Sequence, residues 1–164
     1  MESYVFLVIP ESHEKLLVIA SGHGIRRVAF SPEDFETVLK SYPDAAHKLT
    51  GLLEDATGQI ELYLRGKLQH FSLPLDLESK GEFQRKVMEH LALIPYGKTQ
   101  SYSSLAEGLG TPKATRAAGS ACKANPVPLI VPCHRVVRND GTSGQYLGGT
   151  KFKEILLKME KLNT

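Results

Sequence analysis

A change of pattern near the middle of the chain constrains its fold more than any other feature. Before it, short runs rich in β-branched and aromatic residues occupy 4–9, 15–20 and 25–30, as in strands of a meander or of hairpins. After it, apolar side chains recur every three or four positions, as in amphipathic helices. We therefore expect an α+β protein. Residues 1–78 would form an N-terminal αβ structural domain with a small antiparallel sheet, and residues 79–164 a mostly helical domain.

The remaining elements follow from capping residues and apolar spacing. Ser31-Pro32 is typical of a helix start, because serine caps the helix and proline fits its first turn. A last short strand is predicted at 71–73, and helices are predicted at 31–41, 45–65, 81–94, 103–109, 111–123 and 150–162. The packing side of the final helix is expected to carry Phe152, Ile155, Leu156 and Met159. The helices on either side of Gly110 read as a helix-turn-helix, with Thr111-Pro112 starting the second.

The two halves of the chain differ in charge, although the net charge is only +2. Residues 1–81 hold 8 Lys and Arg against 12 Asp and Glu, whereas residues 82–164 hold 12 against 6. The basic half could face a polyanion such as a nucleic acid. A solvated, lysine-rich surface would give the same count, so charge leaves both interpretations open.

Composition excludes several classes of protein. The 2 cysteines cannot build a disulfide framework. No apolar run approaches the roughly 20 residues that span a bilayer. The first residues lack the basic start and long apolar core of a signal peptide. We expect a cytoplasmic protein without a membrane partner.

The segment Pro132-Cys133-His134-Arg135-Val136 is the main candidate for chemistry. A base or cation beside a cysteine lowers the pKa of the thiol and favours the reactive thiolate. Neighbouring residues of a regular strand point to opposite faces, so cooperation of Cys133 with His134 requires a turn or a bridging water. A buried structural cysteine is the commoner alternative. A metal site is disfavoured because the pair supplies too few ligands.

The second helix of the helix-turn-helix has small side chains and one projecting arginine, Arg116. Small side chains allow the helix backbone to approach another surface closely. A helix that reads base edges more often carries Gln, Asn or several Arg. The helix therefore either packs tightly on a neighbour or contacts DNA by shape and backbone.

The cysteine segment resembles the signature of O6-alkylguanine-DNA alkyltransferases, also called methylated-DNA–protein-cysteine methyltransferases. The resemblance extends from about Phe83 to Glu160. It includes, in order, Ile94-Pro95-Tyr96-Gly97, Ser101-Tyr102-Ser103-Ser104-Leu105-Ala106, Pro112-Lys113-Ala114-Thr115-Arg116-Ala117, Asn125-Pro126-Val127-Pro128 and Tyr146-Leu147-Gly148-Gly149.

The resemblance implies DNA repair by transfer of an alkyl group from guanine O6, and from O4-alkylthymine, to Cys133. Each molecule would act once, with no cofactor and no metal. His134 would act as the base through a bridging water, and Glu160 would orient it. Asn125 would organise the pocket, and Tyr102 would give a proton to guanine N3. The Val136 carbonyl would accept a hydrogen bond from the exocyclic amine of the guanine.

The family binds double-stranded DNA and turns the modified nucleotide out of the helix. Arg116 would fill the vacated stack, and the recognition helix would enter the minor groove. The DNA-binding residues implied in this chain are Arg116, Tyr102, Thr115, Ala117, Ala118, Gly119, Lys123 and Arg135. The pocket residues implied are Pro128, Val136, Tyr146 and Leu147.

Other details depart from the family or leave alternatives open. Cys122 is interpreted as a packing residue of the recognition helix. The N-terminal zinc site of some relatives is not supported, because no cysteine precedes Cys122. We expect a monomer. The alternatives are a non-catalytic protein that recognises lesions, which Cys133 argues against, and a thiol hydrolase that turns over repeatedly.

Overall fold

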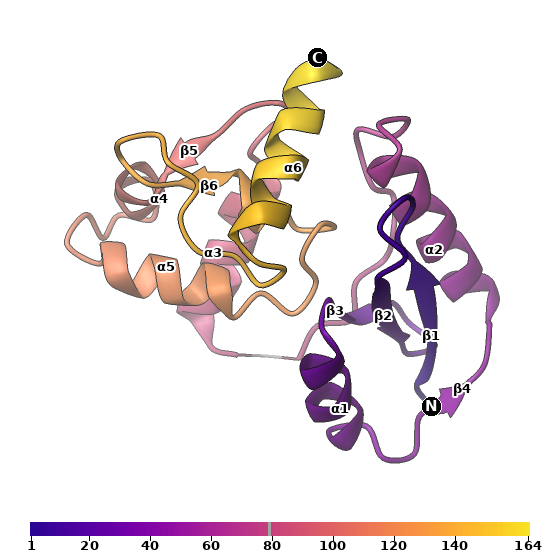
Figure 1. Cartoon of the computed structure of the whole chain (residues 1–164). Helices are drawn as coiled ribbons and strands as arrows, with labels where there is room; N and C mark the ends of the chain where they lie inside the picture. The colour runs from indigo at the N-terminus through magenta and orange to yellow at the C-terminus, as the bar shows by residue number, and fades with distance from the viewer. Residues whose placement is uncertain (79) are drawn as a thin grey trace. The chain divides into compact units, whose positions relative to one another are not determined.

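The computed structural model describes residues 1–78 and 80–164, and it divides the chain into two compact units (Figure 1). Unit 1 is Met1–Glu78 and unit 2 is Ser79–Thr164. Both helices and sheets are present, so the predicted α+β class is confirmed. The two units are described separately below.

Unit 1 is built on a four-stranded sheet of order β3-β2-β1-β4. The strands β1 (Ser3–Val8), β2 (Lys15–Ala20) and β3 (Ile25–Ala29) pair antiparallel in sequence order, which confirms the meander. The short strand β4 (Ala46–His47) pairs parallel with β1. The predicted antiparallel pairing thus holds for β1, β2 and β3, and β4 adds a parallel edge that was not predicted.

Helices cover both faces of the sheet because β2 is apolar on both sides. Leu17 and Ile19 pack with Val38 of α1 (Pro32–Lys40). The alternate residues of β2 are also buried, and α2 (Gly51–Leu64) packs on β2. Ser31 caps α1 by accepting a hydrogen bond from the Asp34 amide at 3.3 Å, so the predicted start of this helix is confirmed.

Two predicted boundaries in unit 1 are wrong for physical reasons. The helix predicted at 45–65 begins only after Thr50, whose side chain caps it by accepting from the Leu53 amide at 3.2 Å. No strand forms at 71–73; instead Leu75 makes a single bridge with Ile25. Gly24 permits this approach, because a Cβ there would lie 2.6 Å from the Leu75 carbonyl carbon.

Unit 2 is mostly helical. Its elements are α3 (Glu82–Ala92), β5 (Gln100–Ser101), α4 (Tyr102–Gly108), α5 (Thr115–Lys123), a 3-10 turn η1 (Cys133–Arg135), β6 (Val136–Val137) and α6 (Thr150–Leu162). Helices α4 and α5 pack together, and β5 pairs parallel with β6. The predicted bounds of the last helix are confirmed. Helix α5 starts later than predicted: Thr111 and Pro112 lie in the preceding turn, and Ala114 is the N-cap.

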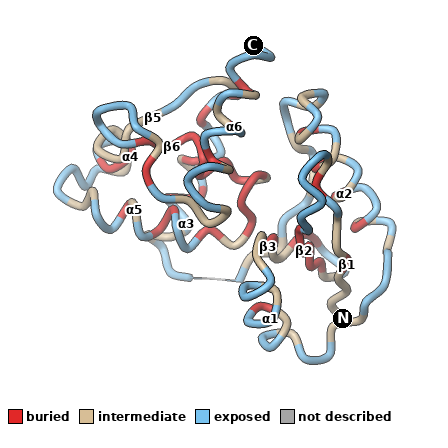
Figure 2. Tube along the Cα trace, viewed as in Figure 1, coloured by how far each residue is buried: buried red, intermediate tan, exposed pale blue. Residues whose placement is uncertain are grey.

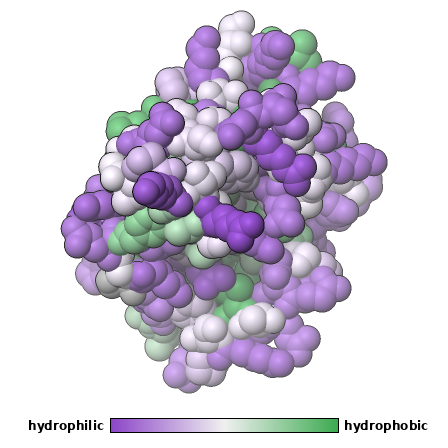
Figure 3. Space-filling view, turned by 90° about the vertical axis from the view of Figure 1, so that its left-hand side faces the viewer, coloured by the Kyte–Doolittle hydropathy of each residue, from purple (hydrophilic) through white to green (hydrophobic). Residues whose placement is uncertain are grey.

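Burial in unit 2 concentrates on the segment that follows α5. Residues 131–137 are buried without interruption, as the red stretch of tube in Figure 2 shows. On the face that Figure 3 presents, hydrophilic side chains predominate and hydrophobic ones form small areas between them. No helix among the described residues is long and apolar enough to cross a membrane. Because residues 131–137 are buried, the segment that contains Cys133 is part of the core of unit 2 and not a surface loop.

Candidate active site

The backbone before the cysteine is fixed by Asn125. Its side-chain amide donates to the Val131 carbonyl at 2.8 Å, and its carbonyl oxygen accepts from the Val127 amide at 3.0 Å. Leu129 has a positive φ of 73°, so this stretch bends where a regular strand could not. Asn125 thus fixes the backbone of the loop that leads into Cys133.

Cys133 begins the 3-10 turn η1 and is 4% exposed. Burial raises the pKa of its thiol to about 11, while a hydrogen bond with the Asn125 side chain and the charge of Lys153 act in the opposite direction. A thiol held in this state needs a nearby base before it can react as a thiolate.

His134 lies next in the turn and is completely buried. Its Nε2 is 2.6 Å from Oε2 of Glu160, which comes from α6. Burial lowers the pKa of His134, whereas the Glu160 carboxylate raises it. The structure therefore brings together two residues, 26 positions apart, to which the family resemblance gives the roles of base and orienting acid.

Arg135, predicted among the DNA-binding residues, is only 7% exposed in the structure. Its side chain is buried, and its Nε donates to Oε1 of Glu160 at 2.8 Å. Its Nη2 donates to Oε2 of the same carboxylate at 3.2 Å, and its Nη1 donates to the Ile94 carbonyl at 2.7 Å. All of these contacts point into the core.

Lys153 is a functional candidate that the sequence reading missed. It is completely buried, and its Nζ donates to the carbonyls of Val136 at 2.6 Å and Gln145 at 3.3 Å. The same nitrogen lies 3.4 Å from the phenol oxygen of Tyr102. Burial lowers the pKa of Lys153 to about 8, while Cys133 and Cys122 raise it.

The missed lysine follows from an error in the predicted face of α6. The helix buries Lys153, Leu156 and Glu160, whereas Ile155 is 53% exposed. The packing face is thus rotated from the one predicted, toward two charged residues. Lys153 and Glu160 lie 3 and 4 positions from Leu156, a spacing that places all three on one face of a helix. Buried lysine is rare, so the prediction favoured a face made of apolar residues.

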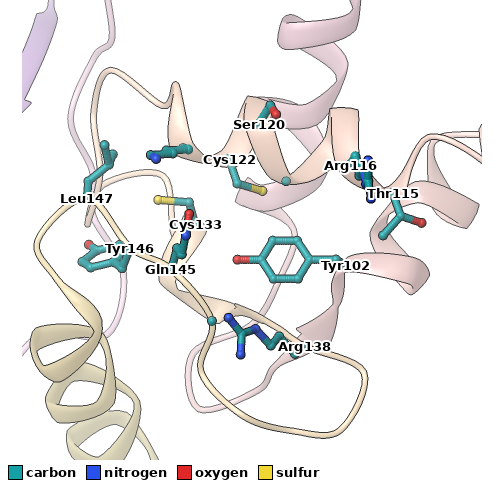
Figure 4. A pocket seen from close by; sticks show the side chains of 13 residues that line it. Tyr102, Thr115, Arg116, Ser120, Cys122, Cys133, Arg138, Gln145, Tyr146 and Leu147 are labelled. Atoms are coloured by element: carbon teal, nitrogen blue, oxygen red, sulfur yellow. The ribbon is translucent and has the colours of Figure 1, made fainter.

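A cavity of about 500 Å³ opens beside Cys133 (Figure 4). In Figure 4 the phenol oxygen of Tyr102 points into this cavity from α4, and Cys122 points into it from α5. Burial, together with the two thiols, raises the pKa of Tyr102 to about 12, so the phenol keeps its proton at neutral pH. The cavity is lined by Tyr102, Thr115, Arg116, Gly119, Ser120, Cys122, Lys123, Cys133, Arg138, Gly144, Gln145, Tyr146 and Leu147.

The cavity gathers about half of the predicted site residues. Among the residues expected at DNA, Thr115, Arg116, Gly119 and Lys123 line it, Ala117 is exposed beside them, and Ala118 is buried. The side chain of Ala118, predicted among the DNA-binding residues, is therefore turned away from the surface of α5.

The predicted pocket walls divide in the same way. Tyr146 and Leu147 line the cavity, but Pro128 and Val136 are buried outside its lining. The Val136 carbonyl, expected to face the base, accepts from Lys153.

Cys122 and Gly144 are further residues of the cavity that the sequence reading did not assign to it. Burial raises the pKa of the Cys122 thiol to about 12, so it remains protonated. Gly144 has a positive φ of 74°, and a Cβ there would lie 3.4 Å from the Tyr102 ring. No group of three or more potential metal-ligating side chains occurs within the described residues.

Two family models match the chain, one in each unit. A family model described as 6-O-methylguanine DNA methyltransferase, DNA binding domain, matches residues 82–162. A second, described as the ribonuclease-like domain of the same protein, matches residues 11–77. The second match covers the half in which the sequence reading found no motif.

Individual relatives and structures lead to the same family. The chain is 38% identical to the constitutive methylated-DNA–protein-cysteine methyltransferase of Bacillus subtilis over 151 residues, 91% of this chain and 90% of the relative. It is 46% identical to that of Mycobacterium leprae over 114 residues, 68% of this chain and 67% of the relative.

Among solved structures, O6-methylguanine methyltransferase of Mycobacterium tuberculosis aligns with a TM-score of 0.86 at 32% identity, covering 100% of this chain and 95% of that one. The same protein in complex with DNA aligns with a TM-score of 0.86 at 32% identity, covering 99% and 94%. The chain therefore belongs to the 6-O-methylguanine DNA methyltransferase family.

Proposed function

We propose that this protein repairs DNA by transferring an alkyl group from O6 of guanine, or O4 of thymine, to Cys133 in a single turnover. The observation that carries the proposal is a buried thiol at a cavity, backed by a hydrogen-bonded His134–Glu160 pair. The bond between oxygen and the alkyl carbon breaks as the bond between sulfur and that carbon forms. Because the thioether is stable, the protein is consumed by one lesion.

Two proton movements balance this reaction. The thiol proton of Cys133 passes to His134 through a bridging water, and Glu160 stabilises the imidazolium that results. Guanine takes up a proton at N3 from Tyr102 as it leaves. Lys153, 3.4 Å from the phenol oxygen, carries a charge that favours the phenolate left behind. Asn125 and Lys153 also favour the thiolate of Cys133.

Unit 2 is the part that binds DNA and carries out the transfer, and unit 1 has a structural role. Arg116 is exposed on α5 and lines the cavity, so it could occupy the stack that a turned-out nucleotide leaves. The small residues of α5 allow a close approach to the minor groove. The protein acts as a monomer on double-stranded DNA in the cytoplasm.

A titration with excess damaged duplex tests the single turnover. Purified protein is incubated with a duplex that carries O6-methylguanine, and repaired guanine is counted. We expect repair to stop at one lesion per protein molecule. Continued repair would favour the hydrolase, and tight binding without repair would favour the lesion-recognition protein.

Replacing Arg116 with alanine is expected to slow repair of the duplex by on the order of 10- to 100-fold, because turning out a nucleotide costs a few kcal/mol that the arginine would offset. Reaction with the free base O6-benzylguanine, which needs no turning out, should keep its rate. Single-turnover rates on the two substrates are compared, with Arg85→Ala on the exposed face of α3 as control. Equal losses on both substrates would contradict this role.

Replacing Cys122 with serine is expected to leave the stoichiometry and site of alkylation unchanged. Burial raises the pKa of this thiol to about 12, and the His134–Glu160 pair that would accept the proton follows Cys133 in the chain. Peptide mapping after reaction with the methylated duplex checks the outcome. If the wild type is methylated on Cys122, and the variant on Cys133 instead, then Cys122 is an acceptor and the prediction is wrong.

A further inference from the structure

The Arg135 side chain contacts the carboxylate that pairs with His134, next to Cys133. Two of its nitrogens donate to the two oxygens of Glu160, at 2.8 and 3.2 Å. The third donates to the Ile94 carbonyl, and the guanidinium lies 5.5 Å from the centre of the Tyr96 ring. A bidentate pair of this kind fixes both the position and the rotation of the carboxylate.

The carboxylate that Arg135 holds is the one that contacts His134. Oε2 of Glu160 accepts a hydrogen bond from Nη2 of Arg135 and lies 2.6 Å from Nε2 of His134. Oε1 accepts hydrogen bonds from Nε of Arg135 and, at 3.1 Å, from the Gly97 amide. The Glu160 carboxylate therefore cannot rotate away from the imidazole without also breaking its hydrogen bonds with the guanidinium.

Charge balance in this buried cluster depends on the arginine. With Arg135 positive, Glu160 negative and His134 neutral, the three side chains sum to zero. Protonation of His134 would bury a net positive charge, which a low-dielectric interior disfavours. Without Arg135, the net charge would be zero only if the Glu160 carboxylate lay beside a protonated His134.

Among the other groups around His134, one acts in the same direction as Arg135. Lys153 of α6 is a second cation and also opposes protonation of the imidazole, while Cys133 precedes it in the turn. The Tyr146 ring packs edge-on, 6.2 Å from the imidazole centre. Glu160 is thus the acid that raises the pKa of His134, and Arg135 is the cation that holds that acid in place.

We infer that Arg135 is a positioning residue, which fixes Glu160 and keeps His134 neutral so that the imidazole can accept the thiol proton of Cys133. The inference rests on the proposed function for its consequence in catalysis. Its physical content, the protonation state of His134, can be measured without any reaction.

The structural alternative is that Arg135 only ties the turn to the end of α3 through Ile94. That role would affect stability and leave the titration of His134 unchanged. The titration of His134, compared between wild type and the variants Arg135→Lys and Arg135→Met, distinguishes the two roles. Lysine keeps the charge without the bidentate geometry, and methionine removes both. Arg85→Met, on the exposed face of α3, is the matched control.

The first measurement is the pKa of His134 by NMR titration, with melting temperature recorded for each variant. We expect the His134 pKa to rise by about one unit or more in Arg135→Met and by less in Arg135→Lys. The second is the single-turnover rate with free O6-benzylguanine as a function of pH. The acid limb of that profile should move to higher pH by the same amount, and the rate should recover at alkaline pH.

An unchanged His134 pKa in a folded variant would overturn the inference, even if the melting temperature fell. If Arg135→Met does not fold, Arg135→Lys carries the same test. If wild type forms no thioether on Cys133 although the His134 pKa shifts as expected, the proposed function fails and the positioning of Glu160 stands.

Discussion

Replacing Glu160 with glutamine is expected to slow alkyl transfer by on the order of 10² to 10⁴-fold, the usual contribution of a positioned acid–base pair. The neutral amide cannot stabilise the imidazolium that forms as His134 takes the thiol proton. Its NH₂ group must also face either the imidazole or the Arg135 guanidinium, since both contact this carboxylate. Single-turnover rates with the methylated duplex measure the loss.

The same variant should be less stable, by about 3–5 kcal/mol, because it leaves a buried guanidinium without its counter-charge. Glu154→Gln is the matched control, since Glu154 lies on the same helix and is exposed. Chemical denaturation separates lost stability from lost chemistry. A Glu160→Gln variant that is folded and transfers within threefold of the wild-type rate would contradict the assigned role.

Replacing Lys153 with methionine is expected to slow alkyl transfer by on the order of 10- to 100-fold. The ammonium group holds the Val136 and Gln145 carbonyls and lies 3.4 Å from the Tyr102 oxygen. Its charge also lowers the pKa of Cys133, so methionine would raise the pKa of the nucleophile further. Methionine has a similar volume, so the comparison isolates the charge and the hydrogen bonds. Lys158→Met on the exposed side of α6 is the control.

Lys153 should also leave a signature in the pH dependence of stability. Its pKa is 10.5 in an ordinary environment and about 8 in the fold. Below about pH 8 the amine is charged in both states, and its burial opposes folding in full. Between about pH 8 and 10.5 the folded protein has released this proton while the unfolded chain retains it, so stability rises with pH.

The free energy of unfolding of wild type, minus that of Lys153→Met, should therefore increase across this window. Urea denaturation at a series of pH values measures it for both proteins. The subtraction is needed because Cys133 acts in the opposite direction: its pKa is raised in the fold, so it destabilises the fold at alkaline pH. A difference that stays flat between pH 8 and 10.5 would contradict the lowered pKa of Lys153.

The strands, and the helices that have clear caps, could be predicted from the sequence because their signals are local. Strand β2 and helix α6 were bounded correctly, and Ser31 caps its helix as expected. Strand β4 has two residues and too little pattern to be recognised, and its pairing with β1 depends on tertiary contact. The late start of α5 reflects a turn that the Thr111-Pro112 pair begins but does not extend into a helix.

At the site, the resemblance named Cys133, His134, Glu160, Tyr102 and Asn125, but the contacts of Arg135 and Lys153 with them were not predicted. Cys133, His134 and Tyr102 lie within recognisable motifs. The contacts of Arg135 and Lys153 depend on which face of α6 turns inward, and periodicity favoured its apolar residues over its buried charges. Arg135 was predicted at DNA, but an arginine is rarely buried, and the sequence holds no local signal for its contact with Glu160.

The central claim, that Cys133 is itself the acceptor, is tested most directly by the mass of the protein after reaction with an O6-methylguanine duplex. Wild type and Cys122→Ser should each gain one methyl group in place of a hydrogen, on the peptide that contains Cys133. Cys133→Ser should gain none while still binding the duplex. A wild-type protein that binds the damaged duplex but keeps its original mass, or that carries the methyl group on another residue, would contradict the account.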